Sequence, residues 1–389
     1  MIVQRRAVPA VLAMAALLLT AGCSAGGGHF PIGPGRTASP GTTAGAPPSG
    51  RATEPVPAAE GSVRVLRTVA EGLRTPWGLA PLPGGGLLVS SRDDGTILRI
   101  DATTGRTSEL GKVSGASPGG EGGLLGIALS PDYASDHMIY AYFTSASDNR
   151  IVRMLYDERK PAGEQLGAPD TVFKGIPKGS LHNGGRIAFG PDGMLYAGTG
   201  DSGRPGLAQD KKSLGGKILR LTPEGEPAPG NPFPGSPVYS YGHRDVQGLA
   251  WDDKQRLFAP ESGQDTWDEL NAIKPGGNYG WPRAEGRSSD AALQNPLAQW
   301  HTGDTSPSGI AYVNGVIWTA GLKGRRLWRI PLRDTEASAP PQAFLTGTYG
   351  RLRTVLAAGG DRVWLVTSDT DGPGHPAKGD DRVLEAKVK

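Results

Sequence analysis

The stretch LHNGGRIAFGPDGMLYAGTGD, residues 181–201, presents a histidine at the entrance to a predicted β-hairpin. Apolar residues on each side of the PDG sequence at 191–193 predict two short strands joined by a turn. His182 is followed by Asn183 and two glycines, so a flexible connection delivers the imidazole onto a rigid strand. His182 is therefore a candidate general base, although a single histidine is more often a structural hydrogen-bonding residue.

A second group of polar residues lies in SYGHRDVQGLAWD, just before another predicted strand. The group consists of His243, Arg244, Asp245 and Gln247. If the strand that follows is the innermost strand of a propeller blade, these side chains would face the same central channel as His182. A surface loop with an arginine–aspartate pair, worth less than about 1 kcal/mol, is the other interpretation.

Carboxylates are concentrated in PESGQDTWDELNAIKPGGNYGWP. Four of them fall within nine residues: Glu261, Asp265, Asp268 and Glu269. Oxygen donors at this density suit Ca²⁺, but the spacing and the central glycine of an EF-hand loop are missing. Density alone leaves a calcium site and a solvated acidic turn equally open.

Cationic side chains follow in GLKGRRLWRI and YGRLRTV. Arg351 and Arg353 alternate on a predicted strand, so they face the same way and form a pair of guanidinium groups. Such a pair could bind carboxylates bidentately, and Lys323 is a further candidate cation. Arginines on a solvated strand face are otherwise the commoner case.

A repeated pattern of about four strands per unit must position these residues. Glycine (60) and proline (34) recur between apolar runs, which favours an all-β chain with many tight turns. Six repeated units of about four strands each, without crossover helices, predict a six-bladed β-propeller of four-stranded antiparallel blades over residues 61–389. The N-terminal strand GSVRVLRTVA is expected to complete the last blade and close the ring. The six copies begin at Pro76, Gly123, Gly185, Gln247, Pro307 and Arg351.

The N-terminal 60 residues predict export rather than a folded domain. Residues 1–22 combine early arginines with a short apolar run, as in a signal peptide. Small residues before Cys23, the only cysteine, resemble the lipobox of bacterial lipoproteins, so we expect a lipid anchor on the extracytoplasmic face of the cell membrane. Residues 23–60, rich in Gly, Pro, Ser and Thr, predict a disordered tether. A net charge of +3 without basic runs argues against nucleic-acid binding.

These motifs, in this order, resemble the soluble quinoprotein glucose dehydrogenase and aldose sugar dehydrogenase family. Members are six-bladed propellers that use pyrroloquinoline quinone (PQQ) and calcium. The resemblance covers residues 62–389 and is carried by PWGLAPLPGGGLLV, GEGGLLGIALSPDY, the histidine stretch, GHRDVQGLAW, ESGQDTWDELN with NYGWP, GLKGRRLWRI and GRLRTV.

The resemblance implies a role for each matching position. His182 falls on the base that removes the proton of the sugar's anomeric hydroxyl while hydride passes to the quinone. Arg244 matches the arginine that contacts the quinone oxygens and stabilises developing negative charge. Lys323, Arg351 and Arg353 match cationic contacts to a cofactor that has three carboxylates.

The resemblance also implies two calcium positions. Gly263 and Gln264 match the pair whose backbone carbonyls hold the calcium beside the quinone, where it acts as a Lewis acid and template. Glu269 and Tyr279 match ligands of a further, structural calcium. The family usually has proline at position 264, and a backbone carbonyl tolerates glutamine there.

Two acidic residues of the implied cofactor site depart from the family's usual pattern. Glu121 stands where the family has glutamine, and Asp245 stands where it has asparagine. Both add negative charge near a tricarboxylate, which would either weaken the affinity for PQQ or reflect a retuned pocket.

The sequence therefore predicts an exported PQQ- and calcium-dependent enzyme that oxidises aldose sugars and passes electrons to an external acceptor. Two rival functions use the same fold. A calcium-dependent propeller lactonase would not need the cationic group, and a non-catalytic glycan-binding propeller would not need His182.

Overall fold

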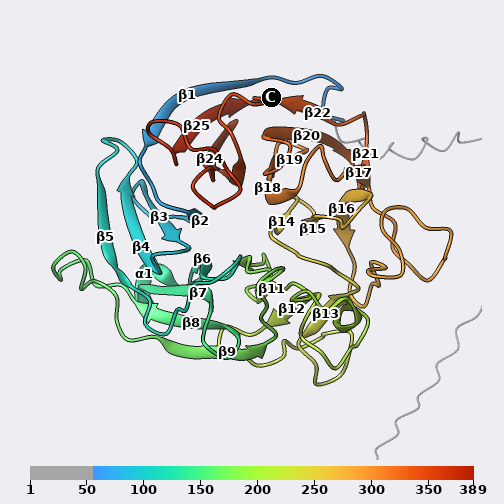
Figure 1. Ribbon diagram of the computed structural model, residues 1–389, viewed down its shortest axis with the longest axis horizontal. Helices are drawn as coiled ribbons and strands as arrows, with labels where there is room; N and C mark the ends of the chain where they lie inside the picture. Colours follow the sequence, from blue (N-terminus) through green and yellow to red (C-terminus); the bar gives the residue numbers. More distant parts are fainter. Residues whose placement is uncertain (1–55) are drawn as a thin grey trace, which may run out of the picture. The chain divides into compact units, whose positions relative to one another are not determined.

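The computed structural model describes residues 56–389, in which 25 strands form six antiparallel sheets around a central axis (Figure 1). This arrangement confirms the predicted six-bladed propeller. The signal segment, Cys23 and most of the predicted tether lie outside the described residues. Helix is confined here to two single turns, α1 (Tyr133–Asp136) and η1 (Pro205–Ala208). In residues 56–389 no helix has the length and apolarity to cross a membrane.

In the first five blades the strands follow one another in chain order, with the first strand of each blade innermost. The first blade contains β2 (Pro76–Pro81), β3 (Gly86–Ser91), β4 (Thr96–Asp101) and β5 (Thr107–Lys112). The second contains β6 (Leu124–Leu129), β7 (Met138–Thr144), β8 (Asn149–Leu155) and β9 (Asp170–Ile176). The third contains β10 (Ile187–Phe189), β11 (Leu195–Gly198), β12 (Lys217–Leu221) and β13 (Val238–Tyr241).

The fourth and fifth blades follow the same order, with one variation at the outer edge of the fifth. The fourth contains β14 (Ala250–Trp251), β15 (Leu257–Glu261), β16 (Trp267–Ile273) and β17 (Ala298–His301). The fifth contains β18 (Pro307–Val313), β19 (Val316–Gly321), β20 (Arg326–Arg333), β21 (Glu336–Ala337) and β22 (Gln342–Phe344). Two short strands share its outer edge, because β20 is long enough to pair with both β21 and β22.

The sixth blade joins the two ends of the described chain. It consists of β23 (Leu352–Ala357), β24 (Arg362–Thr367), β25 (Val383–Val388) and β1 (Val63–Ala70). β1 pairs antiparallel with β25, as the sequence predicted, so the first and last strands lie side by side in Figure 1. This pairing covers an edge that would otherwise be exposed.

The hydrophobic core is distributed between blades. Among the described residues, six apolar clusters occur, one at each junction between neighbouring sheets, and the cluster between the second and third blades also includes Trp77 of the first. The cluster between the sixth and first blades packs Val366 and Val383 against Leu87 and Ile100. Burial of apolar surface therefore holds the ring together at every junction, including the junction where the chain closes.

The innermost strands approach one another closely around the axis. A Cβ atom on Gly309 would lie 2.7 Å from the Cα atom of Thr354, so only glycine fits there without a shift. In the third blade Arg186 fills the axis instead and donates to the Thr354 hydroxyl (3.0 Å) and the Gln247 carbonyl (2.9 Å). Its guanidinium also stacks on Trp77, 4.4 Å from the ring centre.

Candidate active site

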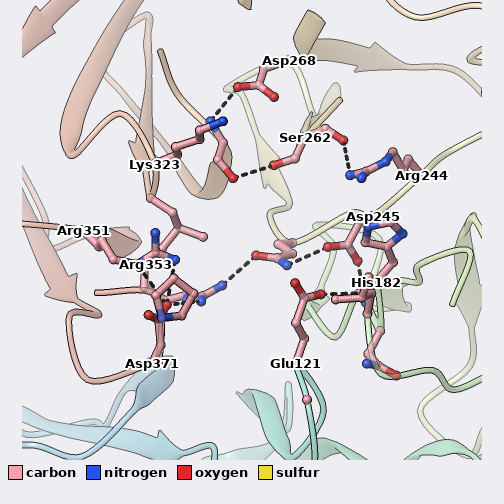
Figure 2. A pocket seen from close by; sticks show the side chains of 18 of the residues that line it. Glu121, His182, Arg244, Asp245, Ser262, Asp268, Lys323, Arg351, Arg353 and Asp371 are labelled. Atoms are coloured by element: carbon pink, nitrogen blue, oxygen red, sulfur yellow. Dashed lines mark hydrogen bonds and ion pairs between the residues drawn. The ribbon is translucent and has the colours of Figure 1, made fainter. Parts of the chain in front are cut away.

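A cavity of about 480 Å³ opens at one end of the axis and is lined by side chains from all six blades (Figure 2). Its size suits a small organic cofactor or substrate. Most of its lining comes from loops that lead into innermost strands, because those strands converge at the axis. The sequence-predicted residues that share this cavity are Glu121, His182, Arg244, Asp245, Gly263, Gln264, Lys323, Arg351 and Arg353.

The imidazole of His182 is fixed by a buried carboxylate. His182 lies just before β10, and its Nδ1 is 2.8 Å from Oδ1 of Asp201, which is fully buried. The indole of Trp281 donates to the other oxygen of Asp201 at 2.8 Å, so the carboxylate is held from both sides. The Nδ1 contact leaves Nε2 as the nitrogen that can accept a proton.

The surroundings of His182 raise its pKa above the ordinary value. Burial lowers the pKa, but the hydrogen bond to Asp201 and the negative charge of Asp245 outweigh that effect. The imidazole can therefore accept a proton and remain charged beside Asp201. Asp201 ends the histidine stretch, but the sequence offered no sign that it would fold back onto His182.

Two carboxylates, Glu121 and Asp245, contact the backbone around His182 rather than any cation. Glu121 accepts the N–H of His182, and Asp245 accepts the N–H of Gly184, each at 2.8 Å. The second oxygen of Asp245 accepts the side-chain amide of Gln247 at 2.7 Å. Burial, together with the nearby charge of Glu121, raises the pKa of Asp245 to about 6.

The opposite wall of the cavity carries the two predicted arginines. Arg351 immediately precedes β23 and Arg353 lies within it, and both donate to the same oxygen of Asp371, at 2.9 and 3.0 Å. The shared partner shows that the two side chains face the same way, as expected. Asp371 had no sequence signal, because it lies in a polar loop. Its other oxygen is buried without a hydrogen-bond partner in the structure.

Three further cations reach the cavity. Arg244 donates to the Ser262 carbonyl (3.0 Å) and to the Gln264 side chain (2.6 Å), while its Nε is buried without a partner. Lys323, in the turn after β19, is exposed at the wall and makes no hydrogen bond or ion pair with the described residues. Arg92, which the sequence analysis missed, lines the same cavity and pairs with Asp93 at 2.6 Å.

The turn at residues 263–266 has its backbone N–H groups bound by carboxylates. Asp268 accepts the N–H of Gly263 at 3.0 Å, and burial raises the pKa of Asp268 to about 6. Glu285 accepts the N–H groups of Gln264, Asp265 and Thr266. No hydrogen bond within residues 56–389 uses the carbonyl oxygens of Gly263 and Gln264. These oxygens are therefore available to a cation, as the resemblance implied.

The dense carboxylates of this region do not converge into a cage. Glu261 accepts from the imidazole of His243 and the N–H of Arg244, both at 2.8 Å, while Asp268 binds two backbone N–H groups. Among residues 56–389, no cluster of three or more His, Cys, Asp or Glu side chains could hold a metal. In the structure, Glu261 and Asp268 bind an imidazole and backbone N–H groups, and backbone oxygens of the neighbouring turn remain available to a cation.

The second predicted calcium position is a small cleft lined by Glu269 and Tyr279. Glu269 accepts the N–H of Gly286 at 2.5 Å and the Asn271 amide at 3.0 Å. Burial and the neighbouring Glu261 raise the pKa of Glu269 to about 8. The Tyr279 hydroxyl donates to the Ala272 carbonyl and accepts the N–H of Lys274, each at 2.8 Å, so it is already engaged on both sides.

The cavity combines a proton acceptor with cations suited to an anionic ligand. Lys323, whose ammonium is unpaired, and Arg244, which has an unpartnered guanidinium nitrogen, line the same cavity as Arg351 and Arg353. These groups fit a planar polycarboxylate, because guanidinium groups bind carboxylates in a fixed geometry. His182 lines the same cavity, so a reacting hydroxyl could reach both the base and the anion.

Comparisons with known proteins place this architecture among sugar-oxidising enzymes. A family model described as Glucose / Sorbosone dehydrogenase matches residues 73–374. The PQQ-bound aldose sugar dehydrogenase from Streptomyces coelicolor is 76% identical, with a TM-score of 0.85 over 86% of this chain and 100% of that one.

Two curated relatives are more distant. Quinoprotein glucose dehydrogenase B from Acinetobacter calcoaceticus is 30% identical over 286 residues, which are 64% of this chain and 60% of that protein. An aldose sugar dehydrogenase from Escherichia coli K12 is 33% identical over 230 residues, which are 56% of this chain and 62% of that protein. Each match therefore spans less than two thirds of the relative's length.

Proposed function

The chain belongs to the glucose/sorbosone dehydrogenase family, and we propose that it is a PQQ-dependent enzyme that oxidises aldose sugars at the anomeric carbon to lactones. The observation that carries this proposal is the convergence of His182 with five cationic side chains on one cavity. The 76% identity to a PQQ-bound aldose sugar dehydrogenase supports the same conclusion.

The cofactor would lie between the walls that carry the cations. Lys323, Arg351 and Arg353 would hold its carboxylates, and Arg244 would face its quinone oxygens. We propose that calcium is held by the backbone carbonyls of Gly263 and Gln264. When bound, PQQ supplies a two-electron acceptor and calcium polarises it.

His182 performs the acid–base part of the reaction. Its Nε2 accepts the proton of the anomeric hydroxyl, while the hydride on the same carbon leaves as the C–O bond gains double-bond character. The carboxylate of Asp201 stabilises the imidazolium that forms and keeps the ring in one orientation. Proton and hydride leave the sugar together, so the product is the lactone.

Reconstitution tests the proposal. The purified protein is loaded with PQQ and Ca²⁺, and dye reduction by a panel of aldoses is followed. We expect sugar-dependent dye reduction, and His182→Ala should reduce it by at least about 10²-fold while PQQ absorbance stays with the protein. His137→Asn, outside the cavity, is the matched control. A protein that neither binds PQQ nor reduces dye would contradict the proposal and favour a lactonase or a glycan-binding propeller.

We also propose that the enzyme is exported and held at the membrane through Cys23, with an external acceptor taking its electrons. The support is the apolar run in residues 1–22, followed by small residues directly before that cysteine. Cell fractionation of Cys23→Ser tests this. Release of the variant into the soluble exported fraction is expected, and unchanged membrane retention would exclude the lipid anchor.

A further inference from the structure

The turn that carries the imidazole has a strained backbone. His182 has a φ of +51°, in the left-handed region that non-glycine residues seldom occupy. The carbonyl of His182 accepts the N–H of Ser202 at 3.0 Å, and that of Asn183 accepts the Tyr142 hydroxyl at 2.8 Å. A conformation of this kind persists only where its surroundings hold it in place.

In the turn formed by residues 182–184, the N–H groups of His182 and Gly184 are bound by side chains from the neighbouring blades. Glu121, from the loop that leads into the second blade, accepts the N–H of His182 at 2.8 Å. Asp245, from the loop that leads into the fourth blade, accepts the N–H of Gly184 at 2.8 Å. In Figure 2 both carboxylates lie beside His182, and neither pairs with a cation.

We propose that Glu121 and Asp245 are positioning residues that hold the imidazole-bearing turn from both sides, through the N–H groups of His182 and Gly184. This role rests on the proposed function, because it matters for catalysis only if His182 is the base. It differs from the direct cofactor contacts that the family resemblance implied for these two positions.

The orientation of one amide determines which substitutions Asp245 can accept. Oε1 of Gln247 accepts from Arg353 at 2.8 Å and from Ser308 at 2.9 Å, so its Nε2 must face Asp245. Both oxygens of Asp245 must therefore accept hydrogen bonds. Asp245→Asn would place one NH₂ group against another, whereas Asp245→Asn combined with Gln247→Glu would restore the pairing at constant net charge.

Glu121 needs only one acceptor oxygen, whereas Asp245 needs two. One of its oxygens accepts the N–H of His182, and its side chain is otherwise exposed at the cavity. Glu121→Gln keeps an acceptor oxygen and should hold the turn, while Glu121→Ala should release it. The two positions thus predict different tolerances toward the same acid-to-amide change.

The test compares Glu121→Gln, Glu121→Ala, Asp245→Asn and the Asp245→Asn/Gln247→Glu double variant. Protection of the His182 and Gly184 amides against hydrogen exchange is measured by NMR without PQQ, alongside kcat of the loaded enzyme. Glu121→Ala and Asp245→Asn should lose amide protection at least about tenfold and lose kcat by about 10²-fold. Glu121→Gln and the double variant should stay within about threefold of wild type. Glu164→Gln, an exposed acid outside the cavity, is the control.

The imidazole titration provides a second readout. The charged groups near His182 are those of Asp201, Asp245, Arg244 and Glu121, and Asp245 raises the pKa of the imidazole. Asp245→Asn should therefore lower the imidazole pKa, an effect that a general loss of stability would not produce. The proposal would be overturned if Glu121→Ala and Asp245→Asn both kept the amide protection of the wild type and Asp245→Asn also kept its imidazole pKa. If the loaded wild-type protein does not oxidise sugars, the proposed function is overturned. The hydrogen-exchange result then still decides whether Glu121 and Asp245 hold the turn.

Discussion

At the residue scale, the chemistry depends on how Asp201 holds His182. Asp201 accepts three donors: the imidazole Nδ1, the N–H of Gly203 and the indole of Trp281, all at 2.8 Å. An asparagine cannot accept all three, because its NH₂ group would face at least one N–H donor. The carboxylate is therefore required both for the orientation of the ring and for the charge that stabilises the imidazolium.

Asp201→Asn should lower kcat by about 10²- to 10⁴-fold without weakening PQQ binding. His182 acts in its neutral form, so activity should rise with pH through the imidazole pKa. Since Asp201 helps to raise that pKa, the variant's rising limb should move to lower pH. The pH profile of kcat, measured from pH 5 to 9, checks this. Asp210→Asn, an exposed acid nearby, is the control, and an unchanged profile in Asp201→Asn would remove Asp201 from the mechanism.

Sequence reasoning identified the residues whose chemistry is visible in their type, such as His182, Arg244 and Arg353. It missed Asp201 and Asp371, which act as partners. Nothing in a sequence shows which buried acid will contact an imidazole 19 positions away, or two arginines at and just before the start of β23. The partner is set by tertiary packing, and only the fold shows it.

At the element scale, the turn at 263–266 illustrates how backbone atoms are prepared for a cation. Glu285 binds three successive N–H groups of this turn and Asp268 binds the preceding one, at Gly263. The carbonyl oxygens of Gly263 and Gln264 accept no hydrogen bond from the described residues, whereas those of Asp265 and Thr266 accept from Thr302. The density of carboxylates in the sequence left a calcium site and a solvated acidic turn equally open, and it did not single out Glu285. In the structure Asp268 and Glu285 bind backbone N–H groups of this turn.

Glu285→Ala should weaken calcium binding by about 10- to 100-fold, because the turn loses the acceptor that fixes its N–H groups. Calcium titration of the PQQ-free protein by calorimetry measures the effect. Asp290→Ala, an exposed acid in the same region, should bind calcium like the wild type. Equal affinities in Glu285→Ala and wild type would show that the turn does not depend on this clamp.

The blade pattern itself was predictable, because each unit repeats apolar strands between glycine and proline turns. All six starting points agree with the innermost strands of the structure. The division of the fifth blade's outer edge between β21 and β22 was not predictable, since both are two- or three-residue segments with no clear alternation. Short edge strands are defined by their partner rather than by their own sequence.

At the scale of the whole molecule, a single guanidinium contacts both ends of the described chain, where the ring closes. Arg329, in β20, is almost fully buried and donates to the carbonyls of Ala58 (2.8 Å), Ala59 (3.1 Å) and Lys389 (2.9 Å). The pairing of β1 with β25 was expected from the sequence. The arginine that anchors this closure to the neighbouring blade was not expected, because its role depends on contacts with residues far away in the chain.

Arg329→Met should lower the free energy of unfolding by about 2–4 kcal/mol, because the three carbonyls lose a buried donor. Chemical denaturation of the PQQ-free protein measures the change. Arg333→Met, at the exposed end of the same strand, should remain within about 0.5 kcal/mol of wild type. If Arg329→Met is equally stable, closure relies on strand pairing and apolar packing alone.

The most direct test is a crystal structure of the protein soaked with PQQ and Ca²⁺. The quinone should lie in the cavity described above, with its carboxylates against Lys323, Arg351 and Arg353 and its reactive ring beside His182. Calcium should contact the carbonyl oxygens of Gly263 and Gln264. Density for PQQ at any other place, or a cavity that stays empty at saturating PQQ, would contradict the assignment of this cavity as the site of sugar oxidation.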